Sequence, residues 1–308
     1  MRWTAMVFLA AMAATASAAE SNRMTSLPDP FRRLLPLHAK LGKPVPGDWL
    51  AEHHEPGQSY AQYVQSRPVR PDRKRRVIYV QPLGEFTPTQ KKIVALAAEH
   101  LGLHFGLPTR LSDDLPLDLI PETARRKHPE WGGDQVLSTF VLQHVLKPRL
   151  PDDAVACIAF TASDLWPGAG WNFVFGQASL SDRVGVWSIH RFGDPDASDA
   201  AYKLCLRRTL KIGSHETGHI FSIPHCIYYQ CNMCAGNHLE EMDRFPLWLC
   251  PNCLAKVCWA TGQTPREHYA GLVTFFQREG LDAEREFCEK SLQRVTQRTA
   301  ETPKHGEE

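Results

Sequence analysis

The sequence predicts an α+β domain built on a twisted, mixed and mostly parallel sheet. Short β-branched runs alternate with amphipathic stretches of helical period, as in strands joined by crossover helices. The 308 residues suffice for one good-sized domain with appendages, and 43% of them are apolar, so a sizeable core can form. The net charge of +1 favours neither a nucleic-acid nor a membrane partner.

The first 18 residues have the pattern of a secretory signal peptide. Met1-Arg2 gives a positive start, residues 4–14 are apolar, and Ala16-Ser17-Ala18 is a small-residue cleavage signal. No later stretch is long and apolar enough for a transmembrane helix. We therefore expect a secreted or periplasmic protein without a membrane anchor, monomeric, with a mature chain beginning near Ala19.

Residues 19–75 are rich in Pro, Arg and Gln and show little periodicity. We interpret them as an N-terminal extension that packs partly on the domain, or as a propeptide. The basic run Arg73-Lys74-Arg75-Arg76 is interpreted as a solvated linker. The catalytic domain is expected over residues 76–260, followed by C-terminal helices and a polar tail over residues 261–308.

Regular elements begin at residue 77, where a β-branched run predicts a buried strand over residues 77–80. A capping box at Thr87, with Pro88 and Gln90, predicts a helix to about His104. Further strands are expected at residues 108–111, 155–160, 172–176 and 184–189. Residues 112–132 are expected to form a loop, and further helices are expected at residues 134–146, 199–220, 264–280 and 283–298.

The helix over residues 199–220 ends in His215-Glu216-Thr217-Gly218-His219. Residues four apart share one helical face, so both imidazoles can bind one metal ion. Glu216 lies one step round the helix, where it can act as general base near an open coordination position. His225 is a candidate third ligand once the chain has turned back. The alternative for so short a motif is a set of solvated surface histidines.

Four of the nine cysteines follow directly. Cys226 and Cys231, then Cys250 and Cys253, form two pairs separated by a loop, which is typical of a structural zinc site with four thiolates. Two disulfides are the alternative in an exported protein. We favour zinc because the group begins directly beside His225, and such a metal would fix where that histidine points.

The other five cysteines are less informative. Cys157 and Cys205 lie in apolar strand and helix patterns, so we expect buried thiols. Cys234 and Cys258 flank the thiolate group and could pair or substitute as ligands. Cys288, on a terminal helix, stays unassigned.

These motifs together resemble the archaemetzincin family of zinc metallopeptidases, also called archaelysins. The resemblance is strong over residues 210–256 and looser over residues 45–295, and it includes the strand segment 77–84. It implies a metzincin-like α/β/α domain with the active-site helix in an upper subdomain and the thiolate zinc in a small lower one. It also implies that Met233 is the Met-turn methionine, a hydrophobic floor beneath the catalytic histidines.

Three features depart from the family pattern. Ser222 stands where the family usually has a glycine that turns the backbone sharply. A serine in a left-handed conformation should cost about 1–2 kcal/mol, which bears on the position of His225. The spacing from Met233 to Cys250 is one residue shorter than in the family pattern. The signal peptide is the third departure.

The resemblance implies a peptidase with two zinc ions, one catalytic and one structural. Glu216 would take a proton from a zinc-bound water, which attacks a peptide carbonyl, and would then pass it to the leaving amine. The expected partner is a peptide or protein substrate, which could pair with the edge strand at residues 172–176. Tyr228 or Tyr229 could stabilise the oxyanion, although buried packing is favoured.

Two other functions are compatible with parts of the sequence. An inactive or catalytically weak zinc-binding relative that acts as a peptide-binding module is the alternative to a peptidase. A zinc ribbon that contacts nucleic acid is disfavoured by the export signal and the near-zero net charge.

Overall fold

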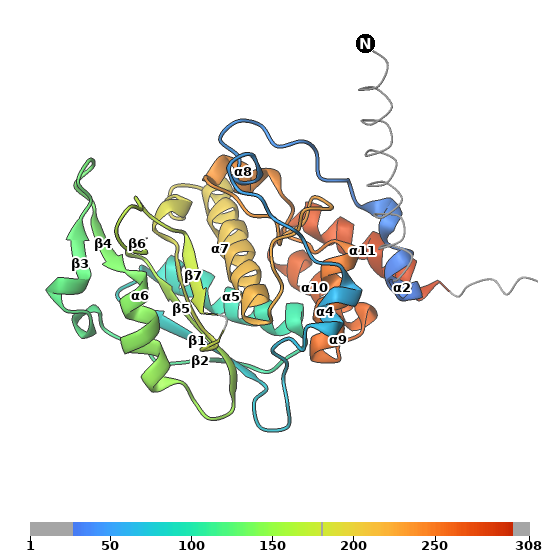
Figure 1. Ribbon diagram of the computed structural model, residues 1–308, viewed down its shortest axis with the longest axis horizontal. Helices are drawn as coiled ribbons and strands as arrows, with labels where there is room; N and C mark the ends of the chain where they lie inside the picture. The colour runs from blue at the N-terminus through green and yellow to red at the C-terminus, as the bar shows by residue number, and fades with distance from the viewer. Residues whose placement is uncertain (1–26, 180, 298–308) are drawn as a thin grey trace, which may run out of the picture.

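A five-stranded sheet forms the centre of the computed structural model, which describes residues 27–179 and 181–297 (Figure 1). Four strands run parallel, and the last pairs antiparallel with its neighbour. The predicted mostly parallel, mixed sheet is therefore confirmed. The order across the sheet is β2 (Thr109–Leu111), β1 (Val77–Leu83), β5 (Ala154–Thr161), β8 (Val184–Ser188) and β7 (Gly176–Ser179).

Helices cover the sheet and continue beyond it. Short 3-10 turns occur at Leu35–Leu37, Leu117–Leu119, Glu122–Ala124, Lys147–Arg149 and His190–Phe192. The α-helices are α2 (Asp29–Arg32), α3 (Trp49–Glu52), α4 (Tyr60–Gln65), α5 (Pro88–Phe105), α6 (Ser138–Phe140), α7 (Asp199–Ile220), α8 (Leu239–Arg244), α9 (Pro251–Thr261), α10 (Pro265–Arg278) and α11 (Asp282–Thr296).

Alternate side chains of β5 enter two different cores, because successive residues of a strand point to opposite faces. Ile158 and Phe160 belong to the larger core, together with α5 and α7. Cys157 and Ala159 belong to the smaller core, together with the π-helical segment Val141–Leu146. The sheet thus lies between two helical layers, as the metzincin-like α/β/α prediction requires.

The helix caps read from the sequence are present. The side chain of Thr87 accepts a hydrogen bond from the Gln90 backbone in a complete capping box, and α5 ends at Gly106 with a φ of 62°. Thr264 and Glu267 form the same box at the start of α10. Local side-chain chemistry therefore determines where these helices begin and end, and the prediction made from it is confirmed.

The helix predicted over residues 134–146 is wrong in its first part. Residues Asp134–Leu137 form β4, which pairs with β3 (Arg125–Lys127) and β6 (Asp164–Trp166) in a second sheet. The buried Gln135 side chain donates to the Asp164 carboxylate at 2.8 Å. This long-range pairing overrides local helical periodicity, and it also places β3 within the predicted loop.

Two further boundaries differ from the prediction. The strand expected at residues 172–176 begins only at Gly176, because Val174 pairs instead with Leu165 beside the second sheet. The eleven-residue helix α9 was missed. It follows directly after Cys250 with Pro251 in its first turn, so a zinc motif and a helix start share the same residues.

The N-terminal extension packs against the helices of the C-terminal half. Leu27, Phe31, Leu34 and Tyr63 are buried in the larger core, and the Tyr63 hydroxyl donates to the Phe221 carbonyl at 2.8 Å. In Figure 1 this segment passes along α8 and reaches α4, which contacts α9. The division into extension, catalytic domain and C-terminal helices stays a prediction. The signal peptide and the end of the polar tail lie outside the described residues.

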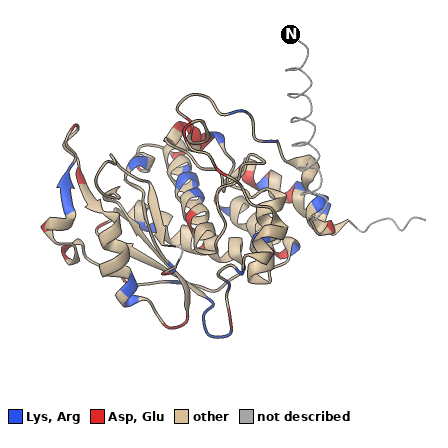
Figure 2. Cartoon of the chain, in the orientation of Figure 1, with Lys and Arg blue, Asp and Glu red and all other residues tan. Residues whose placement is uncertain are grey.

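Basic and acidic side chains are interspersed over the elements (Figure 2), as the near-zero net charge suggests. In the part of the chain that the structure describes, no helix combines the length and apolarity needed to cross a membrane.

Candidate active site and metal centres

Helix α7 carries the first two histidines and ends directly after them. Ser222 takes the left-handed φ of 62° expected from the sequence, and the Ile223 amide donates to the Gly218 carbonyl at 3.1 Å. This is the hydrogen-bond pattern of a helix that ends in a left-handed residue. The chain reverses there, and His225 returns beside the helix end.

Three imidazoles meet at this point. Candidate ligand atoms of His215, His219 and His225 all lie within 4.8 Å of one another. The Nε2 atoms of the first two are 3.1 Å apart. The ring of His225 lies 5.5 Å from that of His215 and 4.8 Å from that of His219, measured between centroids. The structure thus brings the three predicted histidines together.

Each imidazole is oriented through its Nδ1 atom. In His215 and His219 this atom lies 2.7 Å from a backbone carbonyl oxygen, of Asn232 and of Ile223 respectively. In the third histidine, Nδ1 lies 2.7 Å from a carboxylate oxygen of Glu55. An acceptor at Nδ1 fixes the tautomer and leaves the Nε2 lone pair for a metal.

Burial sets the protonation of the site. It lowers the pKa of His215 well below its ordinary value and, with the neighbouring His225, lowers that of His219 to about 4. Neutral imidazole is the form that binds metal. Burial also raises the pKa of Glu216 to about 8. A carboxyl group in such surroundings becomes ionised readily only beside a positive charge.

Glu216 and the three histidines line a pocket of about 330 Å³. A side chain at Gly176 would lie 3.4 Å from the Glu216 Cγ atom, so strand β7 passes directly beside the carboxylate. The wall is largely apolar and aromatic, with one buried lysine, Lys211, from α7. Its large apolar residues are Trp49, Trp171, Phe173, Phe175, Met242 and Phe245.

Met233 lies beneath the histidine-bearing end of α7. A Cβ atom at Gly218 would come within 2.6 Å of the Met233 sulfur, so only glycine permits this contact. The Met233 carbonyl also accepts a hydrogen bond of 2.7 Å from the Cys226 amide. The residue therefore occupies the place that a hydrophobic floor requires.

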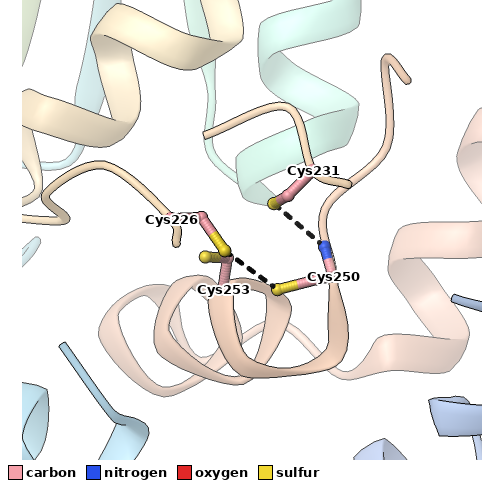
Figure 3. Close-up of side chains that lie close together, drawn as sticks. All are labelled: Cys226, Cys231, Cys250 and Cys253. Carbon is pink, nitrogen blue, oxygen red and sulfur yellow. Dashed lines mark hydrogen bonds between the residues drawn. The ribbon is translucent and has the colours of Figure 1, made fainter. Parts of the chain in front are cut away.

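The second predicted centre is a cluster of four buried thiols (Figure 3). The sulfur atoms of Cys226, Cys231, Cys250 and Cys253 lie within 4.8 Å of one another, and two of them are 3.7 Å apart. A tetrahedral zinc with bonds of about 2.3 Å places its sulfurs about 3.8 Å apart. All nine cysteines are free thiols, so the structure does not contain the disulfides considered as the alternative.

Backbone amides support the thiol cluster. The Cys231 sulfur accepts from the amide of Cys250 at 3.2 Å and from that of Met233 at 3.5 Å. Cys250 is also the N-cap residue of α9, where the helix dipole favours negative charge. These donors favour thiolates, whereas burial raises the pKa of the Cys231 and Cys250 thiols well above the ordinary value, so thiolates at this site require a bound cation.

Apart from Cys234, which also lines the pocket, the remaining cysteines and the two tyrosines are buried packing residues. Burial raises the pKa of the Cys157 thiol to about 12. Burial also raises the pKa of the Cys205 thiol to about 11, although a hydrogen bond with Thr209 acts in the opposite direction. Both values are those expected of inert buried thiols. Cys234 lies near the cluster, and its thiol donates to the Tyr229 carbonyl. Tyr228 and Tyr229 belong to the larger core and do not line the pocket.

Sequence reasoning missed two residues of the site. Glu55 and Trp49 precede the histidine motif by more than 150 positions, and Glu55 contacts His225 while Trp49 lines the pocket. Neither belongs to a recognisable local pattern.

Comparisons with known proteins agree with this geometry. Residues 142–258 match the sequence model of Peptidase family M54. The human protein Archaemetzincin-2 is 33% identical over 269 residues, which cover 77% of this chain and 74% of that protein. The chain belongs to the archaemetzincin family. An archaemetzincin from Thermococcus kodakarensis is 30% identical, over 59% of this chain and 95% of its own length.

A solved structure shows the same fold. The crystal structure of archaemetzincin from Methanopyrus kandleri superposes with a TM-score of 0.50 and 27% sequence identity, covering 63% of this chain and 99% of that one. The present archaemetzincin is therefore a zinc-dependent metallopeptidase. The inactive-relative alternative is not favoured.

The side chains of this archaemetzincin fit zinc. Three neutral imidazoles whose Nδ1 atoms are already held form a three-ligand set with one side open to the pocket, as catalytic zinc requires. The four buried thiols form a closed set. Both donor types are those that zinc prefers.

Proposed function

We propose that this archaemetzincin hydrolyses peptide bonds with Glu216 as general base and with catalytic zinc on the Nε2 atoms of His215, His219 and His225. The observation that carries the proposal is the convergence of three oriented imidazoles and one carboxylate on a single apolar pocket. Zinc at such a site lowers the pKa of a water molecule and polarises a carbonyl oxygen.

Glu216 moves the proton in this proposal. Its raised pKa of about 8 reflects burial, and a neighbouring dication favours the carboxylate again. At neutral pH the group can then accept a proton from the attacking water and return it to the leaving amine. Its place against Gly176 of β7 keeps it at the substrate side of the helix.

The substrate we propose is an extended peptide or protein segment. β7 is the antiparallel edge of the sheet, and among the described residues no strand pairs with its outer side, where a substrate strand could be added. The aromatic and apolar wall of the adjoining pocket suits a large apolar side chain beside the scissile bond.

We further propose that Cys226, Cys231, Cys250 and Cys253 hold a second, structural zinc, giving two ions per chain. Because Cys226 directly follows His225, this ion would fix the turn that delivers the third histidine. The buried position and the amide donors described above support thiolates without an open coordination position.

Metal analysis of the purified mature protein tests both proposals together. We expect two zinc ions per chain, falling to one in His219→Ala. One ion in both proteins would contradict the histidine site, and an absence of zinc accompanied by disulfides would contradict both sites.

A peptide library then tests the activity, with Glu216→Ala as the control that keeps the metal. We expect cleavage by the native protein and none above background by the variant. Equal cleavage by both would contradict the role of Glu216.

Export is a separate proposal, supported by the pattern of residues 1–18. We propose a monomer that acts in the periplasm or outside the cell after cleavage near Ala19. N-terminal sequencing of the protein recovered from these fractions tests the cleavage, and light scattering tests the monomer. Retention of Met1 in a cytoplasmic fraction would contradict export.

A further inference from the structure

The third histidine is held differently from the other two. His215 and His219 are oriented by backbone carbonyls of the catalytic domain, whereas His225 is oriented by the side chain of Glu55. We propose that Glu55 is a positioning residue for His225, and that residues 47–60, which we call the strap, are a permanent part of the catalytic site. This inference rests on the proposed zinc-binding role of the histidines.

The contact with His225 is well defined. A Glu55 carboxylate oxygen lies 2.7 Å from Nδ1 of His225, and the same oxygen accepts a 2.8 Å hydrogen bond from the Trp49 indole. The side chains of Glu55 and His225 are only 18% and 21% exposed. The Trp49 ring meets the imidazole edge-on at 5.5 Å. The carboxylate is therefore itself oriented by a second residue of the strap.

A carboxylate at this position does more than a carbonyl can. It accepts a hydrogen bond from the Nδ1–H group, which fixes the tautomer that leaves Nε2 free, and its negative charge makes the imidazole a stronger electron-pair donor to a cation. Acceptors of this kind behind a metal-binding histidine typically affect metal affinity by about 10–100-fold. His225 lies beyond the end of α7, in the segment after the chain has reversed, so no helix fixes its position. The contact with Glu55 therefore orients a ligand that the helix cannot orient.

The N-terminal half of the strap is fixed to α8. The backbone amide of Trp49 donates to both carboxylate oxygens of Glu241 at 3.1 Å, and the Asn237 amide donates to the same side chain at 2.7 Å. Asp48 forms an ion pair with Arg244. Asp48 and Glu241 lie close enough to His238 to resemble a cation site, but these bonds give the two carboxylates a structural role.

The C-terminal half is fixed to α9. Asn252 accepts a hydrogen bond from the Tyr60 amide at 2.8 Å and donates to the Gln58 carbonyl at 3.0 Å. Lys256 donates to the same carbonyl at 2.7 Å. Because α9 begins at the thiol cluster, the strap is held at one end by the helix that follows Cys250.

Glu55 thus lies between two anchored ends, directly behind a metal-binding histidine. A propeptide that is removed on activation would take the strap with it and leave His225 without its acceptor. We infer that any processing of residues 19–75 ends before residue 47. The strap lies outside residues 142–258, the part that matches the peptidase family model.

Zinc affinity of the histidine site tests the inference without any assay of peptide cleavage. Glu55→Ala, Glu55→Gln and the native full-length mature protein would be titrated with a competing chelator at pH 7. Cobalt(II) absorption would report the ligand geometry. The matched control is Glu85→Ala, an exposed carboxylate outside the strap and outside the pocket.

We expect about 10–100-fold weaker zinc binding in Glu55→Ala and native affinity in Glu85→Ala. The zinc affinity of Glu55→Gln should lie between these two values, because its amide oxygen can accept a hydrogen bond from Nδ1–H but carries no negative charge. The thiolate-bound zinc should remain in every variant and serves as the check of folding.

Native affinity in both Glu55 variants would overturn the inference. If the alanine variant does not fold, the isosteric glutamine variant decides alone: weakened binding supports the positioning role and native affinity overturns it. A native protein with no ion at its histidine site would instead overturn the proposed function, which is a different result.

Discussion

The two proposed metal centres are built from neighbouring residues in opposite ways. Cys226 belongs to a closed set in which all four sulfurs are buried, whereas His225 belongs to an open set that faces a pocket of about 330 Å³. A closed set stabilises the chain, and an open set leaves a coordination position for a substrate. One peptide bond therefore joins a structural region to a catalytic one.

Hydrogen bonds around the two centres run in opposite directions. Backbone amides donate to the Cys231 sulfur, as anionic ligands require. The three imidazoles instead need acceptors behind them, which are two carbonyls and Glu55. The polarity of the surrounding groups thus distinguishes a thiolate centre from an imidazole centre even before a metal binds.

Cys231→Ala should give the largest effect. Loss of a thiolate ligand should forfeit binding energy on the order of 10 kcal/mol, which exceeds or equals the stability of most domains. We expect no cooperative thermal transition by circular dichroism. His219→Ala is the matched comparison at the open site and should still unfold cooperatively. Equal melting behaviour of the two variants would break the distinction between the centres.

Glu216→Gln should affect chemistry alone. The amide cannot act as a base, so we expect peptide hydrolysis to fall by about 10²–10⁴-fold. Zinc content and thermal midpoint should stay at native values, measured on the same preparation. Loss of zinc from this variant would show instead that Glu216 contributes to zinc binding and not only to proton transfer.

A third set of histidines, which belongs to neither centre, should control stability in acid. In the described part of the chain, the ring nitrogens of the buried His100 and His104 have no hydrogen-bond partner. Burial, with a smaller effect of His268, lowers the pKa of His100 to about 3. Burial likewise lowers the pKa of His268 to about 4.

The direction in which stability changes with pH follows from these lowered pKa values. Between about pH 6.5 and pH 4 the unfolded chain binds protons at these histidines and the folded chain does not. Stability should therefore be complete above pH 6.5 and fall as the pH decreases. His100→Phe should reduce this slope in denaturant unfolding with excess zinc. Parallel slopes for variant and native protein would contradict the argument.

The smallest change in stability is expected for substitutions of Ser222, which lies between the end of α7 and His225. Its hydroxyl accepts a 3.2 Å hydrogen bond from the Val69 amide, and its φ is 62°. Ser222→Ala keeps the strained conformation and loses the bond, so it should destabilise by about 1 kcal/mol. Ser222→Gly loses the bond but relieves about 1 kcal/mol of strain, leaving stability nearly unchanged. Denaturant unfolding of the two variants separates these contributions.

The sequence predicted those parts of the molecule that local rules determine. Helix α7 was predicted over residues 199–220 and forms Asp199–Ile220, because its pattern and its ending are local. The left-handed turn at Ser222 was also foreseen. The cysteine spacing indicated a cluster that the structure brings together.

Contacts between distant segments could not be predicted in this way. β4 was expected to be helical because its pairing with β6 depends on residues about thirty positions further on. Glu55 reaches His225 across 170 positions, and no spacing rule links them. The acceptor of one histidine is therefore visible only in the folded chain, whereas the histidines themselves are visible in the sequence.

The order in which the chain is synthesised gives the strap a further consequence. Glu55 leaves the ribosome first, His225 follows 170 residues later, and the helix that anchors Gln58 follows after that. During synthesis at about 5–20 residues per second, the strap has no partner for roughly ten seconds or more. The open centre can therefore be completed only after α9 has emerged, so a chain interrupted before that point carries the histidine motif without its full support.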